Sequence, residues 1–171
     1  IAHIGQYFLL LGRVFRKPEK TNVFWQRFFH EVNAIGIGSL GIVAIISIFM
    51  GAVITIQAAF GFESPWIPLY AVGLAARDSI ILEFSPTIVS LILAGKVGSS
   101  IASELGNMRV SEQIDAIDVM GVNSASYLIL PKIAASVFIF PFVVTISMFL
   151  GHIGGFVLGV AAGVVTPYEF I

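Results

Sequence analysis

The sequence predicts an all-α, polytopic integral membrane protein. Hydrophobic residues make up 57% of the 171 residues and charged residues only 11%, and the mean hydropathy is +0.97. A soluble domain carries roughly 25% charged residues, so this chain has too few charges for a water-exposed surface. Three largely apolar runs, 35–59, 71–104 and 125–165, exceed the about 20 residues with which a helix crosses the hydrocarbon core. Helices are the expected spanning elements because they satisfy their own backbone hydrogen bonds.

Residues 1–33 predict short helices at the membrane surface. In residues 1–17 apolar side chains recur at helical spacing, and Pro18 ends the helix. A second short helix is expected over 22–32, where aromatic residues stand beside basic ones. Aromatic and basic side chains favour the membrane–water interface. The alternative is that these helices pack on other protein.

The first span, 35–59, contains no charged residue. Five Lys and Arg residues precede it, which places the N-terminus in the cytoplasm by the positive-inside rule. The following loop, 61–70, then lies outside. It contains the helix breakers Pro65 and Pro68 and the aromatic interface anchors Trp66 and Tyr70.

The second span, 71–104, contains Pro86, which either starts a new helix or kinks one long helix. The third, 125–165, is too long for one straight crossing, so an extension before Pro131 or a kink near Pro141 is expected. Four glycines of this span form overlapping G-x-x-x-G repeats that predict close packing of another helix: Gly151, Gly155, Gly159 and Gly163.

Charged residues within spans are candidates for function because a charge in hydrocarbon is costly. Glu83 and Lys96 are the main candidates for lining a polar cavity. The alternative for each is a boundary position, with Lys96 extending to the cytoplasmic surface and Glu83 lying near the outer interface. The stretch around Lys96 has Ser90 where a phosphate-binding loop needs glycine and Val97 where it needs Ser or Thr, so the chain is not expected to bind ATP.

A short helix over 106–121 is predicted between the second and third spans. Gly106 can end the preceding span and Gly121 can end this helix. On a helical wheel, one side carries Val110, Ile114 and Ile117, and the opposite arc carries Ser111, Glu112, Asp115 and Asp118. Anionic headgroups prefer basic residues, so the expected partner is protein. Which face docks stays open, and a plain surface helix is the alternative.

At these residues the sequence resembles the MlaE (YrbE-like) family, the permease subunits of ABC transporters that act on lipids with MCE-domain proteins. The resemblance runs from about Asn33 to the end and is densest over 85–122. The family's pattern (G-P, A-G-R-x-G, then A-E-x-G-x-M-R-x-x-E-Q-x-x-A) is met at Pro86, Ala94, Gly95, Gly98, Glu104, Gly106, Met108, Arg109, Glu112, Gln113 and Ala116. The chain departs from it at Leu82, Ser85 and Lys96, where the family has Arg, Gly and Arg.

The resemblance implies a non-catalytic permease subunit of an ATP-driven phospholipid transporter in the bacterial inner membrane. It implies a dimer of two permease chains with N-terminal elbow helices, an MCE-domain protein on the outer side, and a cytoplasmic ATPase that holds ATP and Mg. Neither cofactor nor metal is expected in this chain, and nucleic acid is not a partner. The family has five spans, so two more are expected after Ile171.

The resemblance also assigns site residues. ATPase coupling falls on the 106–121 helix, through Met108, Arg109, Val110, Glu112, Gln113, Ile114, Asp115, Ile117 and Asp118. A lipid cavity between two permeases is expected to involve Glu83, Pro86, Lys96 and Glu104. Two other functions are carried as alternatives: an ion- or proton-coupled carrier that uses Glu83 and Lys96, and a membrane scaffold without transport activity. Lipid species and transport direction do not follow from the sequence.

Overall fold

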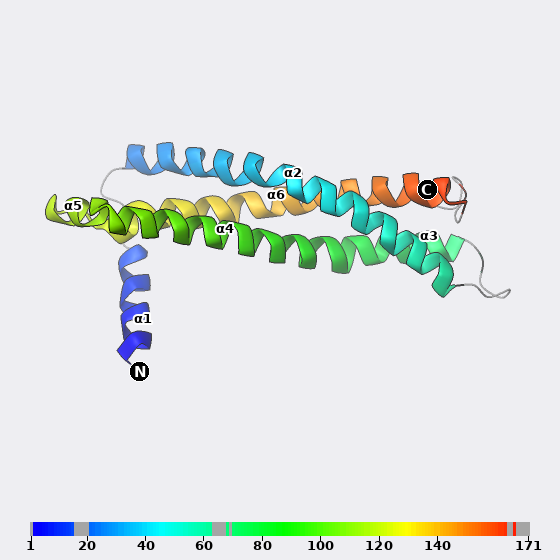
Figure 1. The fold of residues 1–171 in the computed structure, drawn as a ribbon, viewed down its shortest axis with the longest axis horizontal. Coiled ribbons are helices and arrows are strands. Elements are labelled where there is room, and N and C mark those ends of the chain that lie inside the picture. Colours follow the sequence, from blue (N-terminus) through cyan, green and yellow to red (C-terminus); the bar gives the residue numbers. More distant parts are fainter. Residues whose placement is uncertain (1, 16–20, 63–67, 69, 164–165, 167–171) are drawn as a thin grey trace. The chain divides into compact units, whose positions relative to one another are not determined.

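The computed structural model describes residues 2–15, 21–62, 68, 70–163 and 166. Its elements, labelled in Figure 1, are helices α1 (Ala2–Val14), α2 (Thr21–Gly61), α3 (Tyr70–Asp78), the π-helix η1 (Ser79–Phe84), α4 (Ser85–Val110), α5 (Gln113–Val119) and α6 (Ser124–Ala161). No β-strand occurs among these residues. Helix α2, the run Tyr70–Val110 and α6 are each long and apolar enough to cross a membrane. The prediction of an all-α polytopic membrane protein is therefore confirmed.

Helix α2 unites two elements that the sequence predicts separately, the short helix 22–32 and the span 35–59. No proline lies between them, and Gly36 is the first glycine within α2, so nothing in the sequence stops the helix where the two elements join. At 1.5 Å per residue, 41 residues extend about 60 Å, twice the thickness of the hydrocarbon core. The charged N-terminal turns of α2 therefore lie beyond the core. Pro18, Pro65 and Trp66 fall outside the described residues.

The run Tyr70–Val110 is one helix with an irregularity inside it, so Pro86 does not start a new helix. A proline ring clashes with the carbonyl group four residues earlier and offers no N–H group. Directly before Pro86 the chain forms η1, where the Ser85 N–H group donates to the Ile80 carbonyl, five residues back. This wider turn accommodates the proline without breaking the helix. Residues 71–85 thus belong to the second long helix.

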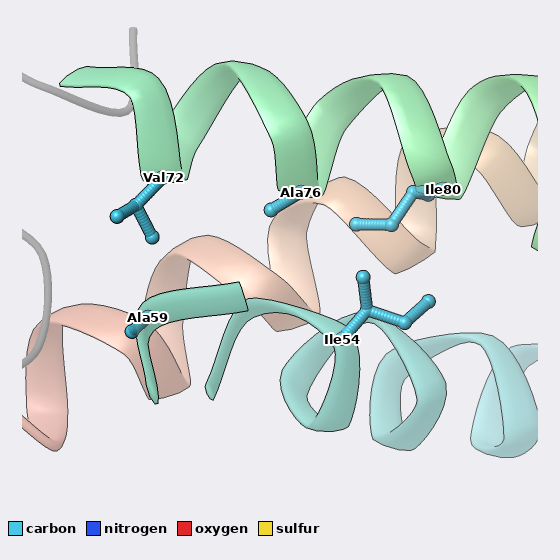
Figure 2. Close-up of a cluster of buried hydrophobic side chains, with 5 residues drawn as sticks. All are labelled: Ile54, Ala59, Val72, Ala76 and Ile80. Atoms are coloured by element: carbon cyan, nitrogen blue, oxygen red, sulfur yellow. The ribbon is translucent and has the colours of Figure 1, made fainter. Parts of the chain in front are cut away.

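The chain divides into two compact units, one formed by Ile1–Gly38 and Gly95–Ile139 (unit 1), the other by Ser39–Ala94 and Phe140–Ile171 (unit 2). In unit 2, α2 packs against α3 and η1 through a hydrophobic cluster. Figure 2 shows the five buried residues of this cluster. The side chains of Val72, Ala76 and Ile80 point toward α2, where Ile54 and Ala59 lie. Two of the five are alanines, so the two segments approach closely.

Unit 2 also contains a contact of bare backbones between α2 and α6. A Cβ atom placed on Gly51 would overlap the backbone of Gly151, and one on Gly154 would overlap the backbone of Ile48. Such contacts are possible only where side chains are absent, which is how glycine promotes helix packing in membranes. Gly151 belongs to the predicted stripe, whereas Gly154 lies outside its register, so the stripe is only part of the contact surface.

The four glycines of the predicted stripe differ in position. Gly151, Gly155 and Gly159 are buried in α6. Gly163 lies past the helix end at Ala161, has a φ angle of +69°, and has open space where a Cβ atom would stand. Its amide donates to the Val160 carbonyl at 3.0 Å. Gly163 thus terminates the helix in the left-handed conformation that favours glycine.

In unit 1, the aromatic residues of α2 face two environments. Phe28 is buried, and its ring lies 5.7 Å from the ring of Phe138 on α6. The Arg27 guanidinium lies 3.9 Å from the ring centroid of Tyr127, also on α6, a favourable cation–π distance. Trp25 and Phe29 remain exposed. Trp25 and Phe29 can therefore serve as interfacial anchors.

Helix α1 is tied to unit 1 near its C-terminal end. The Asn123 side-chain amide donates to the Arg13 carbonyl at 2.9 Å, and Val14 is buried. The rest of α1 exposes large apolar side chains, namely Ile4, Tyr7, Phe8, Leu9 and Leu10. An exposed apolar helix is consistent with the predicted position at a membrane surface.

The backbone contact in unit 2 predicts opposite effects for two alanine substitutions in α2. Gly51→Ala should lower the free energy of unfolding by about 1–3 kcal/mol, because the new methyl group overlaps the Gly151 backbone. A Cβ atom on Gly41 would meet open space, so Gly41→Ala should raise the free energy of unfolding by about 0.5–1 kcal/mol. Thermal unfolding of both variants in mild detergent measures the difference. Equal midpoints would show that α2 and α6 do not touch at Gly51.

Candidate functional site

The turn between α4 and α5 differs from the single helix predicted over 106–121. Helix α4 continues through Gly106 to Val110, because a glycine with helical neighbours on both sides does not by itself end a helix. The break comes at Glu112, which has a φ angle of +58° and a ψ angle of 12°. Its N–H group donates to the Arg109 carbonyl at 3.2 Å, and its carbonyl accepts from Ala116 at 3.0 Å. Glu112 thus closes α4 and opens α5.

Helix α5 ends where Gly121 was expected to end it. Gly121 has a φ angle of +79°, and its amide donates to the Asp118 carbonyl at 3.0 Å. The Val122 amide reaches back to the Ile117 carbonyl at 3.3 Å. This pair of bonds satisfies carbonyl groups that a helix end leaves without partners.

The side chains of α5 and its flanks separate into an inner and an outer set. Ile114 and Ile117 are half-buried. Three apolar residues are strongly exposed, Val110 at 85%, Val119 at 88% and Met120 at 70%. The acidic residues Glu112 and Asp118 are exposed as well. We call these five exposed residues the α5 surface.

An ion pair holds α5 to the end of α4. The Arg109 guanidinium donates to the Asp115 carboxylate, and both side chains are more than half exposed. The pair crosses the break at Glu112, so it limits the angle between the two helices. Met108, half-buried, and Gln113, exposed, complete the predicted coupling residues. Of the predicted set, Met108, Arg109 and Val110 belong to α4 and not to the short helix.

The predicted cavity residues are divided between the two units. Glu83 is exposed and Pro86 is half-buried, both in unit 2. Lys96 and Glu104 belong to unit 1, where both are exposed. The Lys96 ammonium group donates to the Gly38 carbonyl of α2. Lys96 thus has a specific partner on α2.

Glu104 takes part in an ion-pair cluster that the sequence reasoning missed. The Lys132 ammonium group donates to Glu104 Oε2 at 2.7 Å and to Glu31 Oε1 at 2.5 Å. Lys132 is only 4% exposed, while the side chains of Glu31 and Glu104 are 17% and 51% exposed. We call these three residues, from α6, α2 and α4, the Lys132 cluster. The available signal was Lys132 itself, a charge within the third apolar run.

Unit 2 has a polar contact between spans. The hydroxyls of Ser47 on α2 and Ser147 on α6 lie 2.8 Å apart, and Ser47 also donates to the Val43 carbonyl at 2.6 Å. A cavity beside them, also lined by Ser85, Ile80 and Gly151 among others, has a volume of about 10 Å³. That is close to the minimum for one water molecule and far below the volume of an acyl chain.

Residues 28–171 match the family described as Permease MlaE. A probable ABC transporter permease protein of Rickettsia bellii (strain RML369-C) is 38% identical over 157 residues, which cover 92% of this chain and 60% of that protein. A probable ABC transporter permease protein of Synechocystis sp. is 30% identical over 164 residues, covering 96% of this chain and 62% of that protein. The chain thus spans about three fifths of the length of these relatives.

A chloroplast protein of Arabidopsis thaliana is also similar. It is named TRIGALACTOSYLDIACYLGLYCEROL 1, and it is 33% identical over 143 residues, which cover 84% of this chain and 41% of that protein.

The Lys132 cluster predicts that Lys132→Met destabilises the protein. Removing the cation leaves two carboxylates near each other without a counter-charge, at a cost of roughly 3 kcal/mol. This is the lower end of the range for broken buried pairs, because Glu104 retains contact with water. The matched control is Lys96→Met, which removes one bond to a carbonyl group from an exposed lysine and should change stability by less than about 1 kcal/mol. Thermal unfolding in detergent compares them, and a stable Lys132→Met variant would contradict the cluster.

Proposed function

Because this chain belongs to the MlaE permease family, we propose that it is the permease subunit of an ATP-driven lipid transporter, with phospholipid as the substrate class. The names of the Rickettsia and Synechocystis relatives support an ABC transporter. The name of the Arabidopsis relative contains that of a diacylglycerol glycolipid, which favours a lipid over a soluble substrate.

The α5 surface carries the proposal. Helix α5 has seven residues and cannot cross a membrane, yet Val110, Val119 and Met120 expose large apolar areas. Acidic side chains beside them oppose binding to anionic headgroups. A groove on a soluble protein is the partner that fits both features. We assign that partner as a cytoplasmic ATPase, which binds ATP and Mg and hydrolyses the nucleotide in place of this chain.

The exposure pattern of α5 also favours one of the two faces left open by the helical wheel. Ile114 and Ile117 are half-buried against the chain itself, so they have less surface to offer. The docking face is then the outer one, where Glu112 and Asp118 surround Val119 and Met120. This assignment makes the N-terminus cytoplasmic, since α5 and the positively charged segment before α2 are separated by two spans.

The lipid site is proposed to lie between two copies of the chain. The cavity in unit 2 is too small for an acyl chain, so the substrate needs space outside it. Glu83 is exposed within a span, and a carboxylate facing hydrocarbon is costly. A polar cavity shared with a second copy would remove that cost. An MCE-domain protein on the outer side and the bacterial inner membrane as the location complete the proposal.

A substitution of the α5 surface tests the docking. The double variant Val119→Glu with Met120→Glu should lose at least about 90% of the ATPase that copurifies with the full-length protein, because two charges enter an apolar interface. Val119→Leu with Met120→Leu keeps the apolar surface at the same positions and should retain the ATPase. Copurification from mild detergent, with thermal unfolding of both variants, gives the comparison.

The same preparations separate the alternatives by their lipid content and activity. A transporter should contain bound phospholipid and move it into liposomes only with ATP and the ATPase. Transport that follows a pH gradient without ATPase would favour a carrier using Glu83 and Lys96. An ATPase partner with neither bound lipid nor transport would favour a scaffold. If the ATPase copurifies in full with the Val119→Glu, Met120→Glu variant, the ATPase does not dock at the α5 surface.

A further inference from the structure

The Lys132 cluster joins the three long helices of unit 1 at one ammonium group. Lys132 comes from α6, Glu31 from α2 and Glu104 from α4, with N–O distances of 2.5 Å to Glu31 and 2.7 Å to Glu104. Lys132 has nearly no contact with solvent. A buried ammonium group needs a negative partner, so Lys132 must keep at least one carboxylate.

The charges in the cluster do not balance. One cation faces two carboxylates, so release of either carboxylate still leaves Lys132 in a neutral pair. Glu31 is the more buried acid, with 17% of its side chain exposed against 51% for Glu104. Water can therefore solvate a released Glu104 far better than a released Glu31. Glu104 is the partner that can exchange at low cost.

Glu104 is also the member of the Lys132 cluster that lies on α4, the helix that leads into α5. It lies six residues before Val110, the last residue of α4, or about 9 Å by helical rise. The Arg109–Asp115 ion pair fixes α5 to that end of α4. Lys132 lies eight residues after the start of α6 at Ser124. The Lys132–Glu104 bond thus connects the two helices that flank α5 (Figure 1).

We propose that the Lys132–Glu104 ion pair is an exchangeable contact that positions α5 relative to α2, while the Lys132–Glu31 pair stays formed. This inference rests on the proposed docking of an ATPase at the α5 surface. Movement of α5 by the ATPase is carried along α4 to Glu104 and breaks or restores its bond to Lys132. In this proposal Glu104 and Lys132 act as positioning residues.

Glu104→Gln tests the proposal because it removes the exchangeable charge and leaves Lys132 paired with Glu31. In liposomes that contain fluorescent phospholipid, the full-length variant with its ATPase should still hydrolyse ATP. Lipid moved per ATP should fall about fivefold or more, the lower bound of typical coupling between sites. Its unfolding midpoint should stay near that of the wild type. Asp78→Asn removes one acid from the exposed Arg77–Asp78 pair and should leave every readout unchanged.

Glu31→Gln separates positioning from a purely structural role. It should lower the unfolding midpoint more than Glu104→Gln does, because Glu31 is the buried partner. If Glu104→Gln lowers the midpoint as much as Glu31→Gln, or sheds the ATPase, the cluster is only a structural clamp and the proposal is wrong. Unchanged lipid movement per ATP in Glu104→Gln also overturns it.

A distance measurement tests the movement without relying on transport. The 171 residues contain no cysteine, so within them spin labels attach only at the introduced Gln26→Cys on α2 and Gly106→Cys on α4, and any cysteine elsewhere in the full-length protein is first replaced by serine. Gln26 is exposed, and a side chain at Gly106 meets open space. In the wild-type complex the label distance should change on ATP binding. In Glu104→Gln it should already have the ATP-bound value without nucleotide.

The transport assay and the distance measurement together distinguish failure of this inference from failure of the proposed function. If the wild-type complex moves no phospholipid but the label distance responds to ATP, lipid transport is wrong and the positioning role stands. If transport is normal and the distance in Glu104→Gln matches the nucleotide-free wild type, the positioning role is wrong and the transporter stands. If no ATPase copurifies, both fall.

Discussion

The helices of this protein pack under the constraint that the hydrocarbon around them supplies no hydrogen-bond partner. Hydroxyl groups in the long helices accordingly donate to the carbonyl four residues earlier, as in the pairs Ser47 to Val43, Thr55 to Gly51, Ser136 to Lys132 and Thr145 to Pro141. Each such bond satisfies a polar side chain within its own helix. Polar groups that remain after this must be paired between helices, and those pairs decide which helix faces meet.

The two units meet this constraint in different ways. In unit 2, Gly51 and Gly151 allow backbones to touch, and the Ser47–Ser147 pair is a polar link between the same two helices. Contacts of this kind depend on shape, and a single added methyl group disturbs them. In unit 1, an ionic link among three helices centres on Lys132. Ion pairs tolerate small movements and can exchange partners, so unit 1 is the unit suited to respond to a force applied at α5.

The irregular positions in the chain are also where local rules conflict. Pro86 in a long apolar run conflicts with regular α-helical bonding, and η1 resolves this with a wider turn. Glu112 adopts a left-handed conformation that costs roughly 1 kcal/mol outside glycine. Such strain is retained where surrounding contacts determine it. Here the Arg109–Asp115 pair spans the strained residue and sets the direction of α5.

Much of the fold was predictable because it follows from local patterns. Apolar runs identified the membrane spans, and Gly121 was correctly read as the end of a short helix. The break at Glu112 was not predictable, because no glycine or proline marks it and Gly106 offered a more usual signal. The pairing in the Lys132 cluster was equally hidden, since Glu31 lies 101 residues from Lys132 along the chain. No periodicity connects residues at that separation.

The sequence by itself determined that this is an all-α membrane protein, that it belongs among MlaE permeases, and that a short amphipathic helix lies between two spans. These properties depend on composition, helical period and motif spacing, which are local or additive. Only the tertiary structure decided which glycines touch, which face of α5 stays exposed, and which acids share Lys132. These depend on which helix faces meet, because a charge or a missing side chain acts through its neighbour in space.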